Sequence, residues 1–328
     1  MGALLLLPFL FLDVSSAMVR LIRTQVELPG ATGSVALDYL AADRQGGRVW
    51  IPAGETGSVD VLDLGTRRLT RIEGFATKAG ARGPSAVSLG DGMAFIGNRA
   101  SKEICAVDAE RMAKLGCTSL AVSPDGMQYV STTREVWVTA PADRCIAVID
   151  ARGSWPGKQV TRIPIDGRPE GYAVDAERGQ FFTNLEDKNQ TLVIDIRSRK
   201  VVSTWNVPCG NEGPRGLAYD RARQFLFVAC TDKVVVLDGA HGGARLSTLA
   251  TGAGVDNIDY LEDQANLYVA AGRAARLTIG HVDAKGTINV VATAHTADGA
   301  RVVVVAADGT SVVGDPHHGR VLMFSPGR

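Results

Sequence analysis

A phrase of alternating apolar residues ending in aspartate recurs along the chain at an almost constant spacing. Its copies read SVDVLD, EICAVD, CIAVID, TLVID, VVVLD and IGHVD and end at Asp63, Asp108, Asp150, Asp195, Asp238 and Asp283, and a seventh copy, RVLMF, ends at Phe324 without the aspartate. Successive copies are 45, 42, 45, 43, 45 and 41 residues apart. So narrow a range indicates one structural unit that is repeated seven times.

Each repeat carries further apolar segments around this phrase. A lead-in with Gly and Pro, such as residues 213–216, precedes a first segment; a second reads FLFVAC at 225–230, and a fourth reads KVVSTWNV at 200–207. Alternating apolar residues rich in Val, Ile, Leu and Phe predict strands, and the aspartate is expected to start a turn by accepting hydrogen bonds from the backbone just beyond it. Four short strands per repeat predict an all-β fold, a seven-bladed β-propeller with four-stranded antiparallel blades. A pair of β-sandwich domains is the alternative, but it predicts no constant period.

The seventh repeat stops after its third strand, because only SPGR follows Phe324. A spare apolar segment, LIRTQVEL at 21–28, precedes the first complete repeat. We expect this N-terminal strand to close the ring as the outer strand of the last blade, which leaves only short edges unpaired. The 328 residues would suggest about two domains by length alone, but the repeat predicts a single domain over residues 18–328.

The repeats resemble those of a known family. The phrases GPRGLAYDRARQFLFVACTDKVVVLD (213–238) and GRPEGYAVDAERGQFFTNLEDKNQTLVID (167–195) are similar to the Gly-x-Pro-x-Gly, Leu-Tyr-Val-like and Val-Ile-Asp segments of the YVTN, or YncE-like, seven-bladed β-propellers of bacteria. The likeness covers residues 19–324, although blade one lacks the Pro lead-in and blade seven the aspartate. The resemblance implies the propeller fold and, since family members are often exported, favours export; shared architecture does not transfer a function.

The N-terminus is typical of a secretory signal. Residues 1–12 read MGALLLLPFLFL, and Ser15-Ser16-Ala17 offers small residues for cleavage. We therefore expect residues 1–17 to be a signal peptide, although the basic residues that usually begin one are missing. The run is too short for a transmembrane helix. We therefore expect a periplasmic or secreted protein; if Met18 is the true start, the protein is cytoplasmic.

Alignment of the repeats predicts one residue per blade at the mouth of the central channel, where propellers gather functional side chains. These residues are Val35, Ser85, Asp125, Glu170, Arg215, Asp256 and Arg301, with Asn98, Asn184, Glu186, Asp232, Asp315 and His317 nearby at the ends of second strands. The charged members, Asp125, Glu170, Arg215, Asp256 and Arg301, are the candidates for binding.

Two interpretations of these charges remain open. Asp125, Glu170 and Asp256, with the Asn184 carbonyl, offer the oxygen ligands that Ca²⁺ or Mg²⁺ prefers, and such a site would resemble that of propeller lactonases and streptogramin-type lyases. Alternatively, the acids pair with Arg215 and Arg301 or line a water-filled channel. His317-His318 is more typical of a polar hairpin turn than of a metal pair, because adjacent strand residues point to opposite faces.

The five cysteines leave at least one thiol unpaired within the chain. Cys209 precedes the first strand of blade five and Cys230 ends its second, so a Cys209–Cys230 disulfide is sterically reasonable in an oxidising compartment. Cys105 and Cys145 are expected as buried free thiols and Cys117 as a small core residue.

The overall composition narrows the function classes. Lys+Arg and Asp+Glu both number 35, and a neutral balance makes nucleic-acid binding unlikely. No phosphate-binding glycine loop, G-x-S-x-G elbow or C-x-x-C-H haem motif is present. The preferred hypothesis is a monomeric, non-catalytic exported binding or scaffold propeller that presents its loop faces to a protein or small-molecule ligand. The alternative is a metal-dependent lactonase or lyase at the channel mouth.

Overall fold

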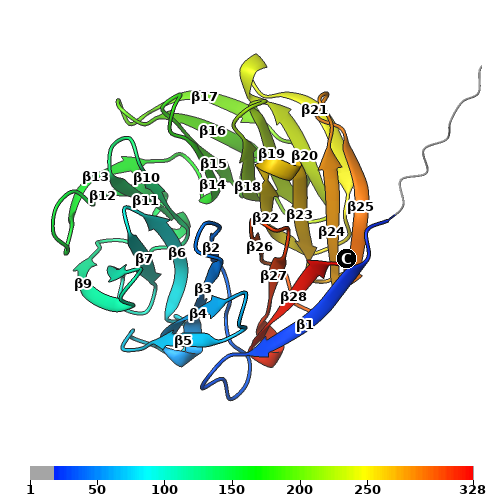
Figure 1. Cartoon of the computed structure of the whole chain (residues 1–328). Coiled ribbons are helices and arrows are strands. Elements are labelled where there is room, and N and C mark those ends of the chain that lie inside the picture. Colours follow the sequence, from blue (N-terminus) through cyan, green and yellow to red (C-terminus); the bar gives the residue numbers. More distant parts are fainter. Residues whose placement is uncertain (1–17, 328) are drawn as a thin grey trace, which may run out of the picture.

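The computed structural model describes residues 18–327, so the predicted signal peptide lies outside the described residues. Seven four-stranded antiparallel sheets are arranged as blades in a ring (Figure 1). This confirms the predicted seven-bladed β-propeller. The repeat is therefore the unit of the fold, and each blade is one sheet with its strands in chain order, except the last.

The strands of blades one to three are β2 (Ala41–Asp43), β3 (Arg48–Ala53), β4 (Ser58–Asp63), β5 (Leu69–Ile72); β6 (Pro84–Gly90), β7 (Met93–Asn98), β8 (Glu103–Asp108), β9 (Ala113–Ser119); and β10 (Met127–Val130), β11 (Glu135–Ala140), β12 (Cys145–Asp150), β13 (Lys158–Pro164). Blades four to six are β14 (Pro169–Asp175), β15 (Gln180–Leu185), β16 (Gln190–Asp195), β17 (Lys200–Asn206); β18 (Pro214–Asp220), β19 (Phe225–Cys230), β20 (Lys233–Asp238), β21 (Ala244–Ala250); and β22 (Val255–Leu261), β23 (Asn266–Ala271), β24 (Arg276–Val282), β25 (Ile288–His295). Blade seven is β26 (Val303–Val305), β27 (Ser311–Asp315), β28 (Arg320–Pro326) and β1 (Leu21–Glu27).

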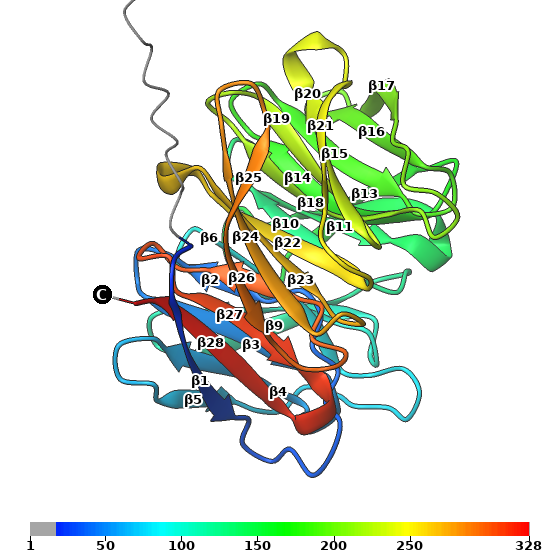
Figure 2. The same cartoon turned by 90° about the vertical axis from the view of Figure 1, so that its right-hand side faces the viewer.

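The ring is closed by the N-terminal strand, as the sequence predicts. β1 pairs antiparallel with β28, from Leu21 opposite Pro326 to Glu27 opposite Arg320. Figures 1 and 2 both show β1 lying along the outer side of β28. The two ends of the described chain are thus held together in one sheet.

Helical structure in residues 18–327 is limited to five single-turn 3₁₀ helices, at Gly54–Thr56, Pro141–Asp143, Gly239–His241, Glu262–Gln264 and Pro316–His318. No helix of this described part is long and apolar enough to cross a membrane.

The core lies between the blades. Facing sheets of neighbouring blades share clusters of buried apolar side chains; Trp50 of blade one, for example, lies in one cluster with Ile96 of blade two. The rings of Trp137 and Phe181 meet across the interface of blades three and four, with centroids 5.0 Å apart. Packing across interfaces of this kind is what stabilises the ring, since one sheet cannot bury both of its faces alone.

The repeated aspartates start the turns that the sequence assigns to them. The Oδ1 atom of Asp63 accepts a hydrogen bond from the backbone N–H of Thr66 at 2.7 Å, and that of Asp195 accepts one from Ser198 at 2.6 Å. Such side-chain turns fix the direction in which the fourth strand leaves the third.

Candidate functional site

The candidate site is a cavity of about 500 Å³ at the mouth of the central channel. It lies where the loops lead into the first strands of the blades. Its lining is almost entirely polar and consists of Asp38, Arg82, Arg99, Ser123, Pro124, Asp125, Pro141, Ala142, Arg168, Glu170, Glu186, Arg215, Asp256 and Arg301. The structure therefore brings together the five charged residues that the repeat alignment places at the channel mouth.

The backbone at the start of the first strands explains this convergence. The strand register shifts between Pro169 and Tyr172, between Pro214 and Leu217, and between Val255 and Ile258. Glu170, Arg215 and Asp256 lie within these three irregular segments, and such bulges re-aim side chains at functional sites.

The glycine after two of these residues is required by close approach of the neighbouring blade. A Cβ atom on Gly171 would lie 2.2 Å from the carbonyl oxygen of Arg215, and one on Gly216 would lie 2.7 Å from that of Asp256. Real contacts of this kind do not occur at such distances, so the lead-in glycine lets adjacent first strands pack closely around the channel.

Arginine and carboxylate side chains pair around the cavity wall. The Nη2 atom of Arg99 bridges Asp38, at 2.9 Å, and Asp125. Glu186 joins two arginines in the same way, Arg168 at 2.8 Å and Arg215.

A separate ion pair joins Arg301 and Asp256, with 3.1 Å between Nη1 and Oδ2. The carboxyl group of Glu170, by contrast, makes no ion pair or hydrogen bond with residues 18–327. Arg82 is exposed and likewise has no ion pair within this part of the chain.

The acids lie deeper than the arginines. The side chains of Asp38, Asp125, Asp256 and Glu186 are 10, 13, 12 and 11% exposed. Those of Arg215, Arg301 and Arg168 are 28, 42 and 51% exposed. The carboxyl group of Glu170 is buried beside these acids, and Arg82 is exposed. The acids Asp38, Asp125, Glu170, Glu186 and Asp256 are called the acidic floor below, and the arginines Arg82, Arg168, Arg215 and Arg301 the arginine rim.

The crowded acids perturb one another. Burial, together with the charges of Asp256, Glu186 and Asp38, raises the pKa of Glu170 to about 8, although Arg215 opposes the shift. Burial also raises the pKa of Asp256, against the effect of Arg301. A titratable group that is shifted toward neutrality inside a polar cavity is a common mark of a functional site.

Replacing Glu170 by Gln should change the pH dependence of stability. Because the folded-state pKa of Glu170 is about 8 and its ordinary value is 4.5, the folded state holds a proton that the unfolded chain releases, and stability falls as pH rises between these values. We expect Glu170→Gln to match the wild type near pH 4.5 and to be more stable by up to about 5 kcal/mol at pH 9, because each unit of the pKa shift corresponds to about 1.4 kcal/mol. Urea unfolding at both pH values measures this; an equal difference at the two would contradict the assignment.

Two stacked tyrosines lie beyond the acidic floor. The rings of Tyr39 and Tyr172 have centroids 5.4 Å apart, and both line a second cavity, of about 490 Å³, which shares Asp38 with the first. Burial, followed by the charge of Glu170, raises the pKa of Tyr39 well above its ordinary value. The tyrosine hydroxyls therefore stay protonated over the whole physiological range.

The four candidate metal ligands do not converge on one point. The Nδ2 group of Asn184 donates to the carbonyl oxygen of Arg215 at 2.5 Å, and its Oδ1 atom accepts from the Thr191 hydroxyl at 2.6 Å. Asp125 and Asp256 are paired with arginines, as described above. As placed, the oxygen atoms of Asp125, Glu170 and Asp256 do not form a group whose members all lie within 4.8 Å of one another.

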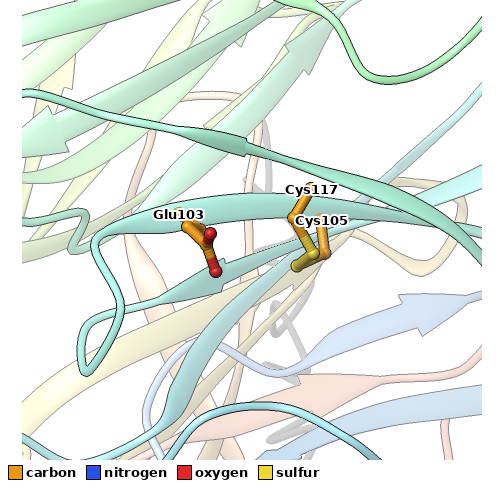
Figure 3. A group of neighbouring side chains, drawn as sticks. All are labelled: Glu103, Cys105 and Cys117. Atoms are coloured by element: carbon orange, nitrogen blue, oxygen red, sulfur yellow. A yellow bond between two sulfur atoms is a disulfide. The ribbon is translucent and has the colours of Figure 1, made fainter.

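Among residues 18–327, the one group of three possible ligand atoms at that spacing is Glu103, Cys105 and Cys117 (Figure 3). The two cysteines of this group are joined to each other as a disulfide, with Cα atoms 3.9 Å apart. This corrects the expectation that Cys105 is a free thiol and Cys117 an unbridged core residue: β8 and β9 place the two directly opposite each other. The structure also joins Cys209 to Cys230, and Cys145 is free and buried.

Other residues expected near the mouth lie elsewhere. Val35 is buried in the apolar cluster between blades seven and one, and Ser85 is buried outside the cavity. Asn98 donates to the carbonyl oxygen of Ala76, and Asp232 lies beside Lys233. Asp315 accepts hydrogen bonds from His318 and Arg320.

The His317-His318 pair lies in the 3₁₀ turn Pro316–His318, in agreement with a polar turn. Its Nδ1 atoms face different carboxylates, Asp298 at 3.7 Å and Asp315 at 2.9 Å.

The sequence reasoning missed Asp38, which takes the blade-one position assigned to Val35. Tyr39 forms a parallel bridge with Ala86, which makes Asp38 the equivalent of Ser85. The signal for Asp38 is weak, since Asp38-Tyr39-Leu40 shares with Glu170-Gly171-Tyr172 only the acid at its first position. Arg82, Arg99 and Arg168, on loops beside the first strands, were also missed, because an arginine in a loop outside the repeated phrase carries no pattern of its own.

No protein-family model matches the chain, and no curated protein matches it. Solved structures match over nearly the whole length. They include a streptogramin B lyase (TM-score 0.74, 12% identity, covering 94% of this chain and 98% of that one) and hydrazine synthase of Kuenenia stuttgartiensis (TM-score 0.74, 16% identity, 91% and 98%). The β-propeller domain of Cps50 (Swd1) from Myceliophteria thermophila also matches (TM-score 0.73, 10% identity, 93% and 98%). At these identities the likeness shows the fold alone: the chain is a seven-bladed β-propeller.

Proposed function

We propose that the chain is a non-catalytic binding protein, of the YVTN or YncE-like kind, that holds a small charged ligand in the cavity at the channel mouth. The observation that carries this proposal is the lining of the cavity, where five carboxylates and five arginines surround a space of about 500 Å³. A volume of this size suits a small molecule, and convergent polar groups give such a site its specificity. The fold supports a binding role too, because propellers commonly act as interaction scaffolds.

The proposed location is an oxidising compartment, reached by cleavage of residues 1–17 and leaving residues 18–328 as one domain. Two disulfides in a chain with five cysteines support it. Disulfides form and persist in the periplasm or outside the cell and are rare in the cytosol.

A screen of charged, metabolite-sized compounds tests the binding function. Thermal unfolding is measured with amino acids, amines, carboxylic acids and sugar phosphates. We expect one class to raise the melting temperature of the wild type but not of Arg215→Ala. Arg152→Ala is the matched control, since that arginine pairs with Asp150 at 2.7 Å away from the cavity. If no class acts, the binding function is wrong.

A lactonase or lyase is the second candidate, and the raised pKa of Glu170 favours it. A carboxyl group whose pKa is about 8 in a cavity has the properties of a general acid or base. The streptogramin B lyase shares the fold, although with only 12% identity. Asp125, Glu170 and Asp256 would have to leave their present partners or positions to hold a divalent cation.

Calorimetry separates the two candidates. The protein is treated with EDTA and titrated with Ca²⁺, Mg²⁺ and Mn²⁺, and Glu170→Ala is titrated in parallel. Heat that Glu170→Ala abolishes would support the metal-dependent enzyme. The binding proposal expects no heat above background in either protein.

A further inference from the structure

The acidic floor has more carboxylates than cationic partners. Within residues 18–327, Asp38 and Asp125 share one cationic partner, Arg99, and Glu170 has no cationic partner. Asp125 as a whole is 9% exposed, and its Oδ2 atom is buried and accepts no hydrogen bond from the described residues. Buried acceptors are almost always paired in native proteins, so this atom calls for a donor from outside the chain.

The arginine rim has the opposite imbalance. Arg168 and Arg215 share the single carboxylate of Glu186, and Arg82 is exposed without an ion pair in the described chain. Arginine binds carboxylate or phosphate groups through two parallel hydrogen bonds. The outer part of the cavity therefore has spare capacity for an anionic group.

We propose that the cavity takes a zwitterionic amino compound, whose ammonium group reaches the carboxylates of Asp125 and Glu170 at the acidic floor and whose carboxylate meets Arg168 and Arg215 at the rim. This inference rests on the proposed binding function and specifies its ligand class. An ammonium group donates three hydrogen bonds, which matches acceptors too widely spaced to surround a single metal ion.

The protonation of Glu170 makes the inference testable by pH. The charged or titratable groups that face Glu170 are Asp256, Glu186, Asp38, Arg215, Arg301 and Tyr39. Since the pKa of Glu170 is raised to about 8, its carboxyl group is largely protonated at pH 7 and must lose that proton to pair with an ammonium group. Binding at pH 7 should release a proton, and the affinity should rise between pH 6 and pH 8.

Calorimetric titration with three lengths of ω-amino acid provides the test: glycine, 4-aminobutyrate and 6-aminohexanoate. Each is compared with the acid that lacks the amine and with the amine that lacks the carboxyl group. At pH 8.5 we expect one amino acid to bind at least about tenfold more tightly than either counterpart. At pH 7 its heat should differ between phosphate and Tris buffers, because the released proton is taken up by the buffer.

Two variants assign the two ends of the ligand. Glu170→Gln should weaken the amino acid and the amine by about tenfold or more and leave the acid unchanged, whereas Arg168→Gln should weaken the amino acid and the acid only. Asp125→Asn repeats the first test if Glu170→Gln does not fold.

Binding of the acids as tightly as the amino acids, an unchanged affinity in Glu170→Gln, or binding of none of the three amino acids would overturn the ligand class. If another class of compound raises the melting temperature in the screen described above, the binding function itself still stands. If no class does, both proposals fail together.

Discussion

Removal of residues 18–29 is expected to lower the free energy of unfolding by on the order of 5 kcal/mol, far more than an ordinary terminal truncation. The deletion takes away β1, which pairs with β28 over seven residues, and the side chain of Leu28, which is 3% exposed. It also leaves β28 as an unpaired edge. Urea unfolding of the truncated protein measures the loss.

Point variants and a peptide control this experiment. Ile22 is on the same strand but 51% exposed, so Ile22→Thr should change stability by no more than about 0.5 kcal/mol. A synthetic peptide of residues 18–29 should restore much of the stability of the truncated protein by adding back the missing strand. A truncated protein that unfolds at the wild-type urea concentration would show that the ring does not depend on this closure.

Loss of both disulfides should have an effect of similar size. The Cys105–Cys117 bridge closes a loop of 12 residues and Cys209–Cys230 one of 21, and chain entropy gives about 3 kcal/mol for loops of this size, or roughly 6 kcal/mol together. We expect replacement of the four cysteines by serine to lower the urea midpoint by about 2 M. The bridges lie in different blades, so their contributions should add.

The controls use the single pairs and a reductant. Each variant that replaces a single cysteine pair should show about half of the fall in the urea midpoint that the fourfold variant shows. Dithiothreitol should destabilise the wild type and leave the fourfold variant unchanged. Cys145 should not interfere, because burial raises the pKa of its thiol and keeps the reactive thiolate scarce. If dithiothreitol has no effect on the wild type, the bridges are absent or contribute nothing.

The fold was predictable from the sequence because each blade of the propeller corresponds to one sequence repeat of nearly constant length. The aspartates at Asp63, Asp108, Asp150, Asp195 and Asp238 each end a third strand in the structure. The spare segment at 21–28 could be assigned to blade seven simply because that blade lacked a strand. Local turn chemistry and a count of strands were enough for both.

The candidate site was predictable only in part. Glu170, Arg215 and Asp256 follow the repeat and could be placed, whereas Asp38 was missed because blade one lacks the Pro lead-in that sets the alignment. The pairing of Arg99 with two carboxylates depends on side chains from three blades, which no period in one sequence reveals.

The cysteines show the same limit. Cys105 and Cys117 can bond because they stand opposite each other in the register of β8 and β9, and a register shift lies just beyond, between Ala106 and Val107. A bulge of this kind moves every later pair by one residue, so the spacing of 12 residues alone did not indicate a bridge.

The closure of the ring also sets an order of events during synthesis. Of the strands described, β1 is synthesised first, whereas its partner β28 is synthesised last. At about 5–20 residues per second, β1 therefore stays unpaired for on the order of tens of seconds. Arg23, Gln25 and Glu27 point outward along it and discourage pairing with other chains during that wait. The propeller can therefore be completed only after β28 has been synthesised.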